Sequence, residues 1–124
     1  MLASQTYSDN FLRINVVEEE EANHVHWYGN STQKNPNQFI IPILIEVLRK
    51  AAWERKKVVL DFRELEYMNS STLTPIIKAL EQAKRASNSV QVIYDKTKRW
   101  QDLSFSALRI FETKDGRIQI TGFL

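Results

Sequence analysis

The sequence predicts an α/β sandwich in which helices lie mostly on one side of a sheet. Apolar residues recur at helical spacing in two long segments, and short β-branched runs lie before and after them. The chain has 124 residues and no cysteine. We therefore expect a single domain over residues 1–124, with an ordinary hydrophobic core and no disulfides.

Five segments have the composition expected of strands. They are residues 11–17, 24–28, 57–62, 89–94 and 117–121. The four consecutive glutamates that begin at Glu18 are expected to form a solvated connection, and residues 29–32 a turn. A helix of the predicted length before residues 57–62 favours a crossover to a parallel neighbouring strand.

The first helix is predicted to begin with Asn35 as its N-cap, because Pro36 and Gln38 follow in the pattern of a helix start. It should run to about Ala52. Its apolar stripe consists of Ile40, Ile43, Leu44, Val47, Leu48 and Ala51.

The second helix has apolar residues at helical spacing, namely Leu73, Ile76, Ile77, Leu80 and Ala83. Because Pro75 disfavours helical geometry at Thr74, we expect a distorted first turn that carries Ser70 and Ser71 and a regular helix from about Thr74. Residues 99–110 are predicted to form a short third helix.

Few residues suggest catalysis or metal binding. His24 and His26 are the only histidines and should point to one face of a strand, while Asp61 lies at a strand end. Without cysteine or an obvious third ligand, surface histidines and a loop-capping aspartate are the preferred interpretation. We therefore predict no catalytic residue, no metal and no cofactor. A small-ligand-binding or enzymatic α/β domain built on these three residues is the alternative.

The loop before the second helix contains Asn69, Ser70, Ser71 and Thr72. Serines at a helix start are common capping residues, and local chemistry alone favours that role. A phosphoryl group at the same place would meet unpaired backbone N–H groups and the positive end of the helix dipole. The loop is therefore a candidate phosphorylation site.

Residues 69–73, which read Asn-Ser-Ser-Thr-Leu after an apolar strand, resemble the Asp-Ser-Ser-Gly-Leu signature of STAS regulatory domains. Together with residues 35–44, the stretch 65–71 is more similar still to the SiaC-type biofilm-regulation phosphoproteins. Asn69 agrees with the loop of the latter family, whereas Asn69 and Thr72 depart from the Asp and Gly of anti-sigma-factor antagonists.

This resemblance implies a STAS-like mixed β-sheet with helices packed mainly on one side. It also implies a non-catalytic signalling protein that is phosphorylated at Ser70, with Ser71 and Thr72 as alternatives. The implied partners are a Ser/Thr kinase, a PP2C-type phosphatase and a diguanylate cyclase as regulated target. The alternative is an anti-sigma-factor antagonist, in which the phosphorylated position is again Ser70.

Aromatic residues suggest where a protein partner could bind. Phe39, Trp53, Trp100 and Phe105 occur near predicted helix ends or outside the apolar stripes, as partly exposed interface anchors do. The predicted partner-binding residues are Asn69, Ser70, Ser71, Thr72, Phe39 and Trp100.

The net charge is only +2, which argues against a nucleic-acid partner. Two basic clusters are interpreted as a helix end and a solvated loop. They are Arg49, Lys50, Arg55, Lys56 and Lys57, and then Lys96, Lys98 and Arg99. No signal peptide or membrane span is predicted, and the lack of cysteine is compatible with a reducing cytoplasm, where we expect the protein to act.

Overall fold

The computed structural model describes residues 2–124; Met1, the first residue of the predicted domain, lies outside them. In these residues a seven-stranded sheet is combined with three α-helices and two 3₁₀ helices. In chain order the elements are β1 (Ala3–Asp9), β2 (Leu12–Glu18), β3 (Ala22–Ser31), α1 (Asn37–Glu54), β4 (Lys57–Asp61), β5 (Leu65–Met68), η1 (Ser70–Thr72), α2 (Leu73–Arg85), β6 (Val90–Asp95), α3 (Arg99–Ser106), η2 (Ala107–Phe111) and β7 (Ile118–Phe123).

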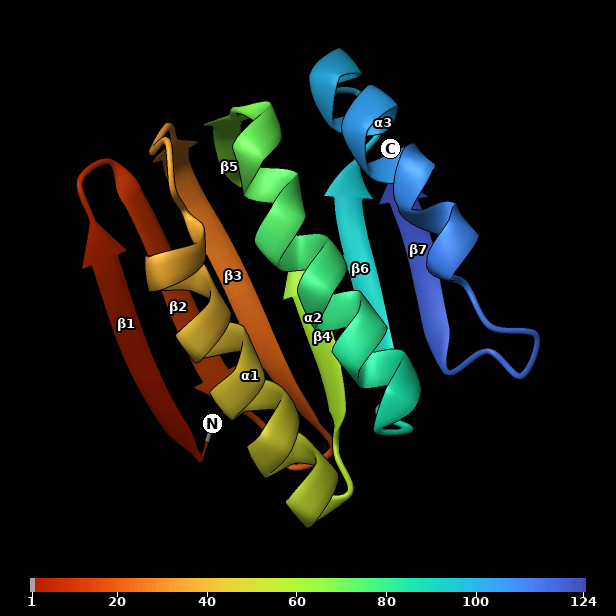
Figure 1. The fold of residues 1–124 in the computed structure, drawn as a ribbon. Coiled ribbons are helices and arrows are strands. Elements are labelled where there is room, and N and C mark those ends of the chain that lie inside the picture. Colours follow the sequence, from red (N-terminus) through yellow and green to blue (C-terminus); the bar gives the residue numbers. More distant parts are fainter. Residues whose placement is uncertain (1) are drawn as a thin grey trace.

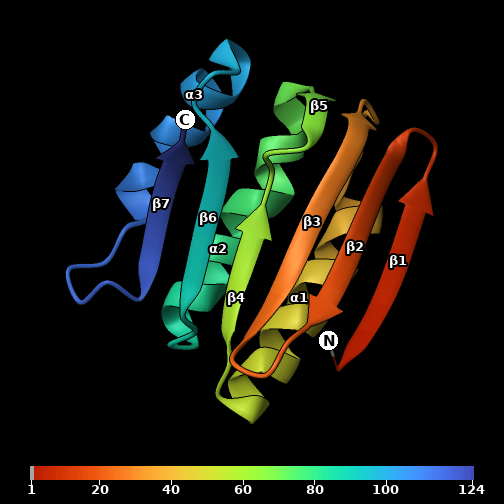
Figure 2. The ribbon, with the colours of Figure 1, turned by 180° about the vertical axis from the view of Figure 1, so that it is seen from behind.

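The sheet is mixed, with the order β1-β2-β3-β4-β6-β7, and β5 extends it beside the end of β3. β1, β2 and β3 are antiparallel, whereas β3, β4, β6 and β7 are parallel. The helices cover one face of the sheet (Figure 1), and the view from behind shows the other face uncovered (Figure 2). The predicted fold class is confirmed.

The core lies between the sheet and the helices. The buried residues of α1 are the six of the predicted stripe. In α2, Ile76, Leu80 and Ala83 are buried, and Leu73 and Ile77 pack against the core from its margin. Hydrophobic periodicity therefore predicted correctly which face of each helix is buried, because burial of apolar area is the main force that holds such helices on a sheet.

Two strands were absent from the sequence prediction. β1 has exposed side chains at most positions and no apolar alternation, and it forms a strand because it pairs with β2 over its whole length. β5 occupies part of the segment interpreted as a loop, and its partner is β3. In both cases pairing with another strand, β2 in a tight hairpin for β1 and the more distant β3 for β5, determines the conformation, rather than the local pattern.

The second predicted strand was too short. β3 continues through Gly29 to Ser31, residues assigned to a turn from their composition. Gly29 has φ +83°, and a Cβ atom built on it would lie 2.1 Å from the carbonyl oxygen of Phe11. Gly29 therefore allows an irregular backbone conformation inside the strand, at the point where the register with β5 shifts between Gly29 and Asn30.

The helix starts were predicted with mixed success. α1 begins at Asn37 without a side-chain cap, and the carbonyl of Pro36 accepts the N–H groups of Phe39 and Ile40, so the predicted cap by Asn35 is wrong. The distorted turn before α2 is confirmed as η1, followed by regular helix from Leu73. The predicted third helix is divided into α3 and η2.

Candidate regulatory loop

The loop that carries Ser70 lies where α2 begins, at the edge of the sheet formed by the carboxyl ends of the parallel strands (Figure 1). β5 places it beside the end of β3, where the N–H of Asn69 donates to the carbonyl of Ser31 at 2.9 Å. η1 then leads into α2. This position is held by strand pairing on one side and by a helix on the other.

Asn69 is the residue that joins the loop to its surroundings. Its Oδ1 accepts the backbone N–H of Thr72 at 3.2 Å and the Thr72 hydroxyl at 2.9 Å. Its Nδ2 donates to the carbonyl of Gln33 at 2.9 Å. An asparagine uses both its acceptor and its donor here, whereas an ionised aspartate would have no donor for that carbonyl.

Thr72 is fully buried, with 0% of its surface exposed. Its hydroxyl lies 2.6 Å from the hydroxyl of Ser31. Because Thr72 donates its only proton to Asn69, Ser31 must be the donor in this pair. Thr72 therefore offers no surface to a kinase or a partner in this conformation. Its burial argues against the two roles predicted for it, as an alternative phosphorylation site and as a partner-binding residue.

Ser70 is exposed and Ser71 is half-buried. Among the described residues 2–124, neither hydroxyl has a hydrogen-bond partner, and their carbonyls accept the N–H of Leu73. Asn69 thus performs the capping role that the sequence analysis considered for the serines, whose hydroxyls do not cap the helix. Three consecutive residues, from Ser70 to Thr72, pass from exposed to buried within one tight turn.

Aromatic side chains lie close to this loop. Tyr67, in β5, is 49% exposed, and its ring centroid lies 6.4 Å from that of Trp100. Trp100 and Phe39 are half-buried and pack against the core from the first turns of α3 and α1. Those two turns open toward the same edge of the sheet as the loop (Figure 1). Tyr67 was missed by the sequence analysis because β5 was interpreted as a loop.

The other two aromatics of the predicted group lie elsewhere. Phe105 has no exposed surface and stacks on Phe62 at a centroid distance of 4.5 Å, so its predicted exposure is wrong. Trp53 is 87% exposed but lies near the end of α1, far along the helix from Phe39. Of the four predicted aromatics only Phe39 and Trp100 accompany the loop, and Tyr67 joins them.

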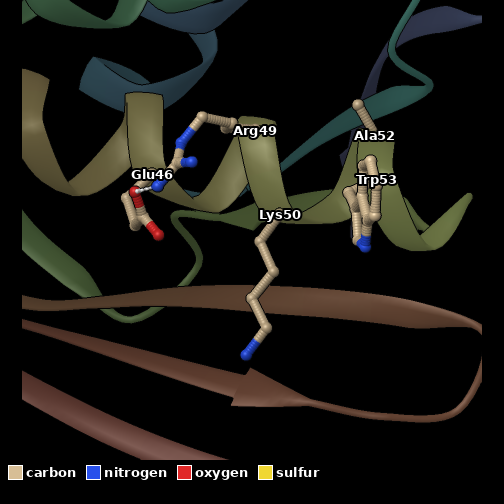
Figure 3. A pocket seen from close by; sticks show the side chains of 5 residues that line it. All are labelled: Glu46, Arg49, Lys50, Ala52 and Trp53. Atoms are coloured by element: carbon tan, nitrogen blue, oxygen red, sulfur yellow. Dashed lines mark hydrogen bonds and ion pairs between the residues drawn. The ribbon is translucent and has the colours of Figure 1, made fainter.

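Trp53 borders an open pocket of about 560 Å³ on the outer side of α1 (Figure 3). Its charged residues are already paired: Arg49 with Glu46, and Lys50 with Glu18 at 2.9 Å. Lys56 contacts Glu54 at 3.7 Å. The basic cluster predicted at a helix end thus lies around the end of α1, but three of its five residues are paired with carboxylates and none lies in the last turn of the helix.

The histidines lie on the uncovered face of the sheet, as predicted for neighbours on one strand face. The rings of His24 and His26 are nearly parallel at 5.9 Å, and Nδ1 of His26 is 3.3 Å from Oδ2 of Asp61. Arg63 binds both carboxylate oxygens of Asp61 through its side chain and one through its N–H. Asp61 therefore caps the following loop.

The electrostatics of this face follow from those contacts. Burial alone would raise the pKa of Asp61, but the hydrogen bonds and charge of Arg63, with the charge of His26, lower it overall. Burial, followed by the charge of His26, lowers the pKa of His24, although Glu19 and Asp61 oppose this. Within residues 2–124 no group of three or more His, Cys, Asp or Glu side chains is placed to hold a metal ion.

No family model matches the chain, and no curated protein does either. Among solved structures, the chain is similar to an uncharacterized protein of the DUF3478 family from Shewanella loihica PV-4, which has a SpoIIAA-like fold. The TM-score is 0.51 and the identity 15%, over 99% of this chain and 90% of the other. The chain accordingly has a SpoIIAA-like, or STAS-like, fold. No helix in the part of the chain that the structure describes has the length and hydropathy needed to cross a bilayer.

Proposed function

We propose that this chain is a non-catalytic regulatory protein that binds a protein partner beside Ser70 and is switched by phosphorylation of Ser70 by a Ser/Thr kinase. The observation that carries the proposal is the exposed Ser70 hydroxyl, free of hydrogen bonds, on a turn that Asn69 and Thr72 hold in place. Ser71 is the alternative site, and it is less accessible.

The charge introduced by phosphorylation supports a switch without refolding. A phosphoryl group adds about −1.5 to −2 charges. At the start of η1 and α2 it lies near backbone N–H groups and the positive end of the helix dipole, which favour a negative group. The fold should therefore tolerate it, whereas a docked partner would have to accommodate a new charge.

The surroundings of Ser70 support a protein partner rather than a small ligand. Tyr67 and Trp100 offer aromatic surface next to the loop, and such residues are frequent anchors of protein interfaces. Phe39 provides a further half-buried ring at the start of α1. The proposed docking surface comprises Phe39, Tyr67, Asn69, Ser70, Ser71 and Trp100.

The identity of the partner is proposed from the sequence resemblance. The SiaC-type pattern points to a diguanylate cyclase as the regulated target, with a PP2C-type phosphatase to reverse the modification. An anti-sigma factor is the second candidate, and the SpoIIAA-like fold is compatible with it. Both candidates use the same surface and the same switch, so the test of Ser70 applies to either.

The test begins with protein isolated from its native cells, with its partners identified and its phosphorylated residue located by mass spectrometry. Partner affinity is then measured by titration for the wild type and for Ser70→Asp, Ser70→Ala and Ser71→Ala. Ser70→Asp should weaken binding by tenfold or more, since each loss of about 1.4 kcal/mol corresponds to a factor of ten. Ser70→Ala should bind the partner but resist the kinase.

Ser71→Ala is the matched control and should affect partner binding and phosphorylation less than the Ser70 variants do. The thermal midpoint of Ser70→Asp should stay close to that of the wild type, because the Ser70 side chain is exposed. Equal partner affinity for unmodified and stoichiometrically phosphorylated protein would refute the switch. Phosphate found only on Ser71 would move the site by one residue.

A further inference from the structure

The two edges of the sheet differ in how their backbone groups are protected. β1 forms one edge and β7 the other (Figure 2). An exposed edge strand presents unpaired N–H and C=O groups that can pair with another chain, and natural proteins protect such edges with charges, prolines, bulges or covering segments.

The edge formed by β7 is covered by the segment just before it. The N–H of Ile120 donates to the carboxylate of Glu112 at 3.1 Å. The N–H of Ile118 donates to the hydroxyl of Thr113 at 3.0 Å, and the carbonyl of Ile118 accepts the N–H of Thr113 at 3.2 Å. Side chains and backbone of residues 112–113 therefore occupy the positions that an added strand would need.

β1 has no such cover among the described residues. Its seven residues have the sequence Ala-Ser-Gln-Thr-Tyr-Ser-Asp, without proline or a basic residue and with a single charge at Asp9. Its register with β2 is unbroken from Ala3 to Asp9. Seven residues also exceed the very short length that often protects an edge.

The pairing pattern identifies which groups of β1 point outward. The N–H of Asn30 donates to the carbonyl of Phe11, so in β2 the alternate residues Leu12, Ile14 and Val16 direct their backbone groups toward β1. Their partners in β1 are Asp9, Tyr7 and Gln5. The backbone groups of Ser4, Thr6 and Ser8 therefore point away from the sheet.

We propose that β1 pairs with β1 of a second copy of this chain in an antiparallel arrangement centred on Thr6. In this register Ser4 faces Ser8 of the second copy and Thr6 faces Thr6, and each facing pair exchanges two backbone hydrogen bonds. The side chains of these residues are small and uncharged, and the hydroxyls of Ser4 and Thr6 donate to Oδ1 of Asn15 within the chain, so no bulky or charged group stands between the two strands. Asp9 faces Ala3, so no like charges oppose each other.

A second copy of this chain is the proposed partner because β1 is complementary to itself in this register. A two-fold axis at Thr6 brings together outward groups that are identical on both sides, as an isologous interface requires. The result is one sheet continuous through both copies. The Ser70 loop follows β5, which is separated from β1 by β2 and β3, so the loop takes no part in the pairing (Figure 1).

Thr6→Pro provides the sharpest test. Proline removes the outward N–H of Thr6, which β2 does not use, so the change is compatible with the pairing inside the chain. The dissociation constant of the dimer is measured by sedimentation over a concentration series. It should be about 30-fold higher for Thr6→Pro than for the wild type, because each copy loses a backbone donor. Thr6→Ala keeps the N–H and is the matched control, which should remain dimeric.

Thr6→Lys guards against a failure of the proline variant to fold. It places an ammonium group opposite its symmetry copy, so it should weaken the dimer, and added salt should partly restore it. In hydrogen exchange of the wild type, the amides of Ser4, Thr6 and Ser8 should become protected as concentration rises, while Gln5 and Tyr7 stay protected throughout. A wild-type chain that is monomeric at millimolar concentration, or a dimer unaffected by both variants, would overturn the proposal.

Discussion

At the scale of single residues, Asn69 decides the shape of the candidate site. It supplies three side-chain hydrogen bonds, two within the loop and one to the segment before α1. The adjacent Ser70 makes none among the described residues. A rigid residue that holds the turn and a free hydroxyl beside it are the arrangement that a switch by charge requires, since the modified residue can change without disturbing the fold.

Replacement of Asn69 tests this division of roles. Asn69→Ala should lower the free energy of unfolding by about 2 kcal/mol, because an N-cap is lost and the Thr72 hydroxyl loses its acceptor in a buried site. Urea denaturation monitored by circular dichroism measures the change. Ser70→Ala is the control and should stay within about 0.5 kcal/mol of the wild type. Similar stabilities for the two variants would mean that Asn69 does not hold the loop.

At the scale of elements, β3 is the strand on which the site depends. It pairs with β2 over residues 23–29, with β4 over residues 22–26 and with β5 over residues 29–31, and β5 leads directly into the loop. The irregularity at Gly29 marks the change from one neighbour to the next. The conformation of this one residue therefore affects where β5 and the Ser70 turn lie.

Two glycine substitutions test the importance of that irregularity. Gly29→Ala should destabilise the fold by about 3 kcal/mol, because the residue has φ +83° and its new Cβ would meet the Phe11 carbonyl. Gly116→Ala, also at positive φ, should cost only about 1 kcal/mol, since the nearest atom lies at 3.3 Å on the flexible side chain of Gln119. Thermal or urea unfolding compares them. Equal costs would show that the close approach at Gly29 is relieved by movement of the backbone.

At the scale of the whole molecule, the two faces of the sheet have different chemistry. The helix-covered face is apolar. It carries the rings of Trp27, Phe62 and Tyr94, and Phe105 of α3 packs against them; all four are fully buried. The uncovered face has charged and titratable groups, among them His24, His26 and Asp61. This second face makes the stability of the protein depend on pH.

The direction of that dependence follows from His24. Its pKa is lowered from the ordinary value of 6.5, mainly by burial and then by His26. Below about pH 6.5 the unfolded chain therefore binds more protons than the folded one, so stability should fall as the pH is lowered through 6.5 toward the folded pKa. Unfolding measured between pH 7.5 and pH 5 should show a smaller loss for His24→Gln than for the wild type. An identical loss in both proteins would assign the acid sensitivity to other groups.

The sequence by itself determined the buried stripes of α1 and α2, the irregular turn before α2 and the fold class, because helical periodicity and proline geometry act over a few residues. Only the tertiary structure decided the rest. β1 and β5 are strands because of the strands they pair with, β2 and β3, and not because of their own side-chain pattern. Exposure differs between Ser70 and Thr72 because neighbouring side chains in a tight turn point in different directions. Trp53 is exposed near the end of α1, whereas Phe105 of α3 stacks on Phe62 in the core. Which of them meets the core is determined by the elements packed around them.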